Sequence, residues 1–228
     1  MATKAAQKKE KKDTENTVTH LVNNFVMAHR KIIITVFVAL ITALIVLVAV
    51  SVVTERRSTA ALETVEQAFA DWERSRMDGA ADSATEETVI QTLVTVAEKN
   101  SRSLAGARAW LTVAEIYFSR SDWKTAAGYY ESAARAAPRA YTAPLAWFNA
   151  GVSADNAGDA DAAVAAFTQA ASHASFAWNA RAWFNLGRVQ EQAGRTAEAV
   201  DAYQKLAALY PDNEYTKLAK SRLIVLNQ

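Results

Sequence analysis

The side chains that could carry out catalysis are few in this chain and are poorly placed to act together. His20 and His29 precede an apolar segment of 22 residues, whereas His173 follows it. A histidine pair or triad therefore cannot assemble in the longer, C-terminal part of the chain. The sequence has no cysteine, which excludes a thiol nucleophile, a disulfide and a cysteine-based zinc site. It also lacks a glycine-rich loop that would hold a phosphate, so neither enzymatic activity nor a cofactor is predicted.

A cluster of carboxylates is the remaining candidate for chemistry. Asp155, Asp159 and Asp161 superficially suggest a calcium loop, but their spacing does not match an EF-hand and no Glu stands at the twelfth position. We interpret these residues as caps and solvated groups at a turn and helix start, and no metal site is predicted. Glu86 and Glu87 are explained in the same way, because negative charge is favourable in the first turn of a helix.

Three regularly spaced tryptophans indicate that the carboxylates lie on a repeated helical unit. Trp110, Trp147 and Trp183 recur at intervals of 37 and 36 residues. Each is followed at fixed offsets by a small residue, an alanine and an aromatic residue: Ala114, Gly151 and Gly187; Ala126, Ala163 and Ala199; Tyr130, Phe167 and Tyr203. This pattern resembles the tetratricopeptide repeat (TPR). The resemblance implies an all-α fold, a TPR α-solenoid of antiparallel helix pairs with repeats at about 107–140, 144–177 and 180–213.

The repeat pattern has a physical basis in the packing of two helices, A and B, in each unit. A large aromatic residue on helix A must fit beside small residues where helix B crosses, which explains the Gly or Ala four residues after each Trp. The turn between the helices follows, and there Gly158 and Gly194 are predicted to adopt positive φ, with Ser121 in their place in the first unit. Intervals of 36 and 37 residues exceed the usual length of about 34. The extra residues are therefore expected in the connectors between repeats, with Pro144 opening the next helix.

Further helices are predicted on both sides of the three repeats. Apolar residues at helical spacing mark one helix from about residue 59 to 77 and a second helix from Ser83. Residues 55–105 thus resemble a degenerate first helical pair, as is common at the end of a repeat array. Residues 106–228 contain the three repeats and, after Pro211, a helix that is predicted to cap the solenoid.

An apolar segment near the N-terminus predicts a membrane anchor. Residues 32–53 contain no charge and reach roughly 33 Å at about 1.5 Å per residue, enough to cross a bilayer once. A secretory signal peptide is the alternative, but its apolar core is shorter, and here 31 residues precede the segment. We therefore predict a retained transmembrane helix. Thr35, Ala39 and Ala43 form a stripe of small residues along which a partner helix can approach, although such stripes also arise by chance.

The charges on either side of this segment predict its orientation. Residues 1–31 contain seven basic and three acidic residues, a net charge of +4, whereas residues 55–228 contain 18 and 21, a net charge of −3. The basic end is expected to stay in the cytoplasm, so that the repeats are exported. Residues 1–16 are too polar to fold alone, and residues 18–26 predict either an amphipathic juxtamembrane helix or an extension of the span. The mildly acidic repeat domain argues against nucleic acid as a partner.

The A helices of stacked pairs line the concave side of a solenoid, where partners bind. Counting each Trp as the fourth residue of its repeat, positions 2, 5, 9 and 12 are expected to face this groove. They are Arg108, Leu111, Glu115 and Phe118; Leu145, Phe148, Val152 and Asp155; and Arg181, Phe184, Arg188 and Glu191. Apolar anchors beside charges suit an extended peptide or a partner helix. Alternatively, the aromatic residues pack against the neighbouring repeat or the C-terminal helix.

The complete arrangement resembles that of the bacterial inner-membrane TPR proteins that accompany the Sec translocon and periplasmic chaperones. The shared features are the basic N-terminus, the juxtamembrane helix, the single span, the degenerate first pair and the three repeats. The resemblance implies a non-enzymatic scaffold in the bacterial inner membrane, with a cytoplasmic N-terminus and periplasmic repeats. The implied partners are translocon subunits, a periplasmic chaperone or an exported client, and an oligomer is compatible with it.

Two alternatives remain open. Residues 210–219 also resemble a stretch in bacterial envelope TPR proteins, so the chain is alternatively a scaffold for outer-membrane assembly, cell-wall or division machinery. An organelle import receptor with its repeats facing the cytosol is the second alternative. It requires the opposite topology to the one that the lysines predict.

Overall fold

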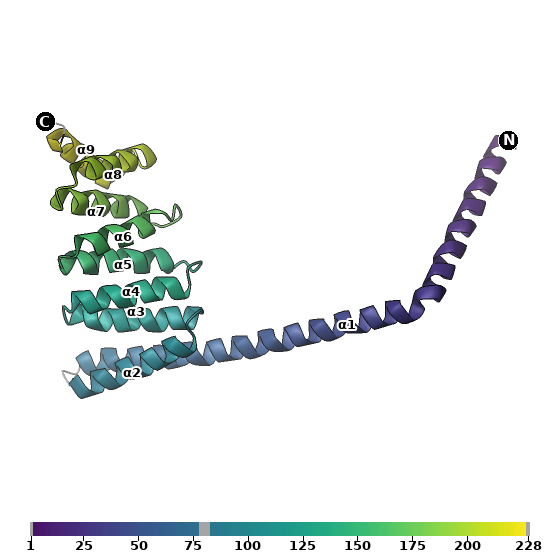
Figure 1. The fold of residues 1–228 in the computed structure, drawn as a ribbon, viewed down its shortest axis with the longest axis horizontal. Helices are drawn as coiled ribbons and strands as arrows, with labels where there is room; N and C mark the ends of the chain where they lie inside the picture. Colours follow the sequence, from purple (N-terminus) through teal and green to yellow (C-terminus); the bar gives the residue numbers. More distant parts are fainter. Residues whose placement is uncertain (1, 78–82, 227–228) are drawn as a thin grey trace. The chain divides into compact units, whose positions relative to one another are not determined.

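The computed structural model describes residues 2–77 and 83–226, and these residues form helices joined by short turns, without a strand in either range (Figure 1). The helices are α1 (Ala2–Met77), α2 (Ser83–Lys99), α3 (Leu104–Ser119), α4 (Trp123–Ala136), α5 (Ala143–Asn156), α6 (Ala160–Ala171), α7 (Asn179–Gln192), α8 (Thr196–Leu209) and α9 (Glu214–Leu226). The predicted all-α fold is confirmed. The chain separates into two compact units, residues 1–55 and 56–228.

The first unit consists of the larger part of α1. Its backbone is already helical from Ala2, whereas the polar composition of residues 1–16 predicted disorder. The difference has a local cause, because Ala, Lys, Gln and Glu are strong helix formers that need no hydrophobic core to adopt this backbone. The predicted amphipathic face at residues 18–25 involves side chains outside the described part of the structure.

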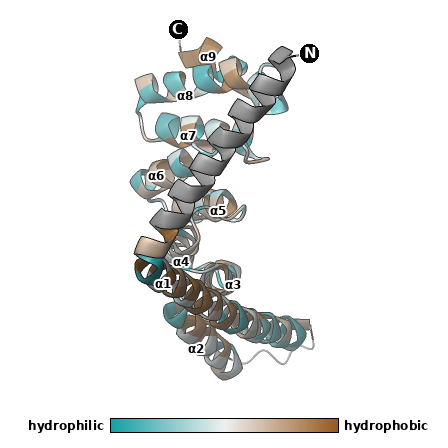
Figure 2. Ribbon diagram, turned by 90° about the vertical axis from the view of Figure 1, so that its right-hand side faces the viewer, coloured by the Kyte–Doolittle hydropathy of each residue, from teal (hydrophilic) through white to brown (hydrophobic). Residues whose placement is uncertain are grey.

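One apolar stretch of α1, beginning at Ile34, is long and apolar enough to cross a membrane by length and composition. Its ribbon is brown in Figure 2, and its large apolar side chains are not buried against another element, with exposed fractions between 42% for Ile41 and 67% for Leu47. Exposed apolar side chains in such number are unfavourable in water. They suit a helix surrounded by lipid or by other apolar helices.

In the second unit the helices pair as the repeat pattern predicts. The pairs are α3 with α4, α5 with α6 and α7 with α8, and Figure 1 shows them stacked in chain order. The turns within pairs contain Ser121 at φ 61° and Gly158 and Gly194 at φ 75°, which confirms the prediction of positive φ at all three positions. Asp159 then caps α6 through a hydrogen bond from Ala162 N, in agreement with its interpretation as a capping residue.

The residues beyond the usual repeat length lie in the connectors between pairs, as predicted. Residues 137–142 join α4 to α5 and residues 172–178 join α6 to α7, whereas only residues 210–213 join α8 to α9. Pro144 stands in the first turn of α5, where its missing N–H has no intrahelical partner to lose.

The small residue four positions after each Trp was predicted to make room for the Trp itself. In the structure it packs instead against an aromatic ring of helix B. A β-carbon built on Gly151 would lie 2.8 Å from Phe167 Cδ1, and one on Gly187 would lie 2.6 Å from Tyr203 Cε1. Phe167 and Tyr203 are fully buried. Each ring therefore occupies the volume that a side chain on helix A would need. Trp183 lies only partly buried, with Lys205 Nζ 5.7 Å from its ring centroid.

Residues 56–77 of α1 and helix α2 form the first helical pair of this unit. Val65, Trp72 and Leu93 are buried in one hydrophobic cluster that continues into α3. The Trp72 indole Nε1 donates a hydrogen bond of 2.8 Å to Glu86 Oε1. The pair therefore covers the apolar face that α3 would otherwise expose at this end of the array.

Candidate partner-binding surfaces

The exposed side of the A helices carries a series of ion pairs between successive helices, and we call this side the A-helix face. Arg108 Nε of α3 donates to Glu66 Oε1 of α1 at 3.0 Å. Arg188 of α7 pairs with Asp155 of α5, and it also donates to Gln192 Oε1 at 2.8 Å. Arg188 is therefore placed on this face as predicted, but its charge is already engaged within the chain.

Two predicted groove residues are buried, and their expected exposure is wrong. Leu111 is 6% exposed and Phe148 is 2% exposed. The Phe148 ring contacts Phe167 at 5.5 Å and Trp178 at 5.5 Å between centroids, and Arg181 covers it with the guanidinium carbon 5.2 Å from its centroid. The physical reason is that the long connector at 172–178 folds over the ring. Phe148 is thus a core residue and cannot contact a partner in this conformation.

The C-terminal end of the A-helix face is covered by the chain itself. Phe184 packs between Tyr203 and Tyr215, with ring centroids 5.8 Å and 5.6 Å away. Arg222 of α9 forms an ion pair with Glu191, and Tyr203 Oη donates to the same carboxylate at 3.0 Å. The hydrogen bond from Arg222, followed by that from Tyr203, lowers the pKa of Glu191 against the opposing effect of burial. Helix α9 therefore lies where helix A of a further repeat would lie.

Three other predicted groove residues, Phe118, Glu115 and Val152, remain partly accessible. Phe118 is half-buried, with its ring 4.7 Å from that of Trp123, and Val152 is half-buried beside the cluster of Phe148. Glu115 lies close to Tyr130, and its own burial raises its pKa, while the charge of Arg108 opposes this shift. Here the face combines partly covered apolar groups with a carboxyl that is not fully solvated.

A cavity of about 280 Å³ opens between α1, α3 and the connector at 137–142. Its lining comes from these three elements and combines apolar, charged and hydroxyl groups: Leu62, Glu66, Leu104, Arg108, Leu111, Tyr141 and Thr142. Leu104 is 45% exposed and Tyr141 is 87% exposed. Of the predicted groove residues, Arg108 and Leu111 are brought together here. This is the part of the A-helix face with exposed apolar groups and a depression to receive a side chain.

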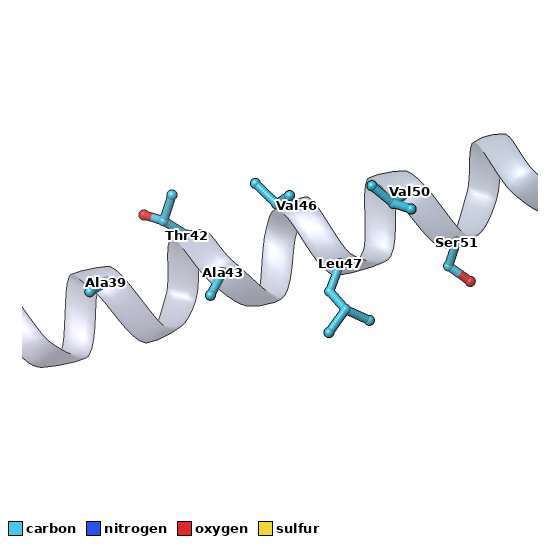
Figure 3. Close-up of a pocket in the computed structure, with 7 residues that line it drawn as sticks. All are labelled: Ala39, Thr42, Ala43, Val46, Leu47, Val50 and Ser51. Carbon is cyan, nitrogen blue, oxygen red and sulfur yellow. The ribbon is translucent and has the colours of Figure 1, made fainter.

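The small residues of the apolar segment lie along one row of α1. Figure 3 shows Ala39, Ala43 and Leu47 in this row, beside Thr42 and the valines of the next row. The hydroxyl groups of Thr42 and of Thr35, one turn before Ala39, donate to the carbonyl oxygen four residues earlier, both at 2.8 Å. These hydroxyl groups are thus satisfied within the helix, as a lipid environment requires.

A second, larger cleft of about 840 Å³, which was not predicted from the sequence, lies between the two long connectors. Pro138, Arg139 and Tyr141 of the first connector face His173, Phe176 and Trp178 of the second across it. The aromatic residues and the extra repeat length were visible in the sequence. However, the repeat pattern does not specify connector conformation, so nothing indicated that the two connectors face each other.

Among the side chains that the structure describes, those of residues 26–32, 34–77 and 84–226, no group of three or more His, Asp or Glu is arranged to hold a metal ion. Asp159 caps a helix, as described above, and Asp161 pairs with Arg195. These two carboxylates therefore stabilise the fold, one as a helix cap and the other in an ion pair.

Comparison with known proteins agrees with the helical-repeat architecture. Residues 117–177 and 148–214 match the family model of the tetratricopeptide repeat. A TPR repeat-containing protein from Treponema pallidum (strain Nichols) is 30% identical over 222 residues, which cover 90% of this chain and 93% of that protein. Two crystal structures of nearly identical TPR-like repeats, from a Podosopora anserina protein described as a putative kinesin light chain, are similar in fold. Each has a TM-score of 0.50, with 12% and 14% identity, and covers 75% of this chain and 87% or 86% of that chain.

Proposed function

Because this chain belongs to the family of tetratricopeptide repeat proteins, whose arrays serve as protein-interaction scaffolds, we propose that it is a membrane-anchored adaptor of the bacterial cell envelope. In this proposal α1 holds the chain in the inner membrane, with the N-terminus in the cytoplasm and the repeats in the periplasm. The repeats bind a protein partner on the A-helix face. The partner is a subunit of the Sec translocon, a periplasmic chaperone or an exported client.

The anchor and its orientation are supported by two features of α1. The stretch from Ile34 is apolar and unburied, and the residues before it carry a net charge of +4, which is the arrangement of a cytoplasmic flank. The C-terminal part of α1 belongs to the repeat unit, because Val65 and Trp72 pack in its core.

The orientation can be tested by single-cysteine labelling, because the chain has no cysteine of its own. Lys8→Cys and Ser101→Cys place one thiol on each side of the apolar segment. In intact spheroplasts, a membrane-impermeant maleimide is expected to label Ser101→Cys but not Lys8→Cys. Both are expected to react after the membrane is dissolved. The opposite labelling would contradict the orientation, and a processed chain that lacks the segment would contradict the anchor.

The binding position is carried by one observation, the cavity of about 280 Å³ at the first repeat. It combines the exposed Leu104 and Tyr141 with the Glu66–Arg108 ion pair, so a partner can insert an apolar anchor and hydrogen-bond at the rim. By contrast, α9 covers Phe184 and engages Glu191 at the other end of the face. Partner contact is therefore proposed at the first repeat.

In-cell photocrosslinking tests this position and identifies the partner. A photoreactive amino acid replaces Leu104 at the cavity, and as a matched control it replaces the exposed Gln204 on α8. Translocon subunits, chaperones or exported chains captured from Leu104 and not from Gln204 are the expected result, and Arg108→Ala is expected to reduce that capture. Equal capture from both positions would refute the cavity as the binding position.

An envelope scaffold for outer-membrane assembly, cell-wall or division machinery is the alternative function. Its motivation is the sequence of residues 210–219, but several of these residues have structural roles. Thr216 Oγ1 donates to Tyr210 O at 2.6 Å and Tyr215 N donates to Asn213 Oδ1 at 3.0 Å, which together dock α9. Capture of cell-wall, division or outer-membrane proteins from Leu104 would favour this alternative.

A further inference from the structure

We propose that the cleft of about 840 Å³ between the two long connectors is a second binding site, which takes an acidic, extended segment of a partner protein. We call it the connector cleft. It goes beyond the scaffold function proposed above, because it lies between the residues that join repeats. Tyr141 lines both the connector cleft and the cavity at the first repeat, so the two sites are neighbours.

The walls of the connector cleft are ordered before any partner binds. Asn179 is 2% exposed, and its Nδ2 donates to Ala171 O at 2.9 Å and to His173 O at 2.8 Å. Phe176 N donates to His173 O at 2.9 Å, so the second connector is closed on itself by hydrogen bonds. In the first connector Ala140 N donates to Ala137 O at 2.9 Å. A preformed wall reduces the entropy that binding has to offset.

Two large aromatic side chains remain exposed on these walls. Tyr141 is 87% exposed and Trp178 is 45% exposed. The Trp178 ring is held by Phe148 and Phe176, with ring centroids 5.5 Å and 6.1 Å away. Its exposed part is thus held in place. Fixed aromatic groups with an exposed face are typical of sites that bind extended or proline-containing peptides.

The charge of the connector cleft selects the kind of segment. Arg139 and His173 line it, and its lining includes no carboxylate. Arg181 stands beside it, with its guanidinium carbon 5.6 Å from the Trp178 ring centroid. Within the described ranges neither Arg139 nor Arg181 has a carboxylate at ion-pair distance. This local positive charge contrasts with the net charge of −3 over residues 55–228, and it favours Asp and Glu on the partner.

Random-peptide display on the full chain in lipid nanodiscs tests the proposal and does not require the partner to be identified first. The enriched peptides are expected to be acidic and to contain an aromatic residue or proline. A labelled enriched peptide is then titrated, with fluorescence anisotropy as the measurement. Arg139→Glu is expected to weaken binding at least about tenfold, the factor that corresponds to 1.4 kcal/mol. The same peptide with Lys in place of its acidic residues is expected not to bind.

Two controls and a second test variant make the outcome decisive. Lys124→Glu makes the same charge change at an exposed position of α4 outside this cleft, and it should leave binding unchanged. Trp178→Ala should weaken binding, but Trp178 also packs on the buried Phe148. Arg139→Glu tests the connector cleft without this complication, because Arg139 is exposed on its connector and its replacement leaves the core intact. Arg108→Ala lies in the neighbouring cavity and should have no effect on the peptide.

Several results would overturn the proposal. They are a basic or absent peptide consensus, equal affinity for Arg139→Glu and Lys124→Glu, and binding that depends on Arg108 instead. Sedimentation of the chain provides one more, since dissociation of a dimer by Arg139→Glu would make the connector cleft a contact between two copies. Binding that depends on Arg108 would place the peptide in the neighbouring cavity. The other results do not bear on crosslinking from Leu104, so the adaptor function stands or falls separately.

Discussion

Gly187→Ala probes the closest approach between the two helices of a repeat. The added β-carbon would lie 2.6 Å from Tyr203 Cε1, 2.7 Å from Cδ1 and 3.0 Å from Cζ. Tyr203 is fully buried, and its hydroxyl group is held by Glu191. The ring therefore cannot turn away without disturbing either the core or the contact that docks α9.

The magnitude follows from two opposing effects. Overpacking of a filled core costs about 1–3 kcal/mol, whereas Ala in place of Gly inside a helix is favourable by about 0.5–1 kcal/mol. Gly187→Ala is therefore expected to lower the free energy of unfolding by roughly 0–2.5 kcal/mol. In a domain of this size that corresponds to a fall in Tm of up to roughly 10 °C.

Gly128→Ala is the matched control, because it makes the same chemical change in the middle of α4, where a β-carbon would meet nothing within 4 Å. It is expected to stabilise the protein by about 0.5–1 kcal/mol through helix propensity alone. Thermal unfolding of the full chain in nanodiscs, followed by circular dichroism, measures both. If Gly187→Ala raises Tm as much as Gly128→Ala does, the explanation of the repeat pattern by close helix approach is wrong.

Three further substitutions follow from the same structure. Gly106→Ala should destabilise the protein more than Gly187→Ala, because its β-carbon would lie 2.1 Å from a backbone carbonyl oxygen, which is less free to move than a side chain; thermal unfolding compares the two. Ser121→Gly should stabilise the protein by up to about 1.6 kcal/mol, because relief of about 1–2 kcal/mol of left-handed strain is offset by about 0.4–1 kcal/mol for the greater freedom of Gly in the unfolded chain. Denaturant titration measures this. In the folded state the hydrogen bond from Arg222 lowers the pKa of the Glu191 carboxyl. The ionised carboxylate therefore stabilises the fold at pH values above the pKa that Glu191 has in the unfolded chain. This stabilisation is lost as the pH falls through the lower pKa of the folded state. Acidification should therefore make α9 more susceptible to proteolysis, and Arg222→Gln, which removes the charged partner, should reduce this pH dependence.

The sequence was sufficient to predict the features that depend on residues close to one another in the chain. Positive φ at Gly158 and Gly194 follows from a residue type that tolerates it, and Ser121 adopts the same conformation because the helix pair around it has the same geometry. The extra repeat length could be placed in the connectors for a similar reason. A longer turn within a pair would separate the two helices, whereas a longer connector leaves both pairs intact.

The sequence was insufficient where contacts depend on the path of a connector. Phe148 occupies a position that usually faces the groove, yet residues 172–178 cover it and place Trp178 against its ring. Helix periodicity describes which side of α5 a residue is on, but it does not describe what another segment lays over that side. The buried Asn179, which holds this connector through two backbone carbonyl oxygens, would be the residue to examine in other chains with the same spacing.

The two ends of the A-helix face differ in a way that affects binding. At the C-terminal end, α9 supplies Arg222 to Glu191 and Tyr215 to Phe184, so a partner there would have to displace a helix that is already paired. At the first repeat, Leu104 and Tyr141 are exposed beside a cavity, and binding requires no displacement. A partner that contacts both this cavity and the connector cleft would use Tyr141 in each contact, and the two sites would then act together because they are held on one array. The shorter connector at residues 210–213 is sufficient to join a helix pair to α9, so under the two proposals the extra length of the other connectors serves to present residues to a partner.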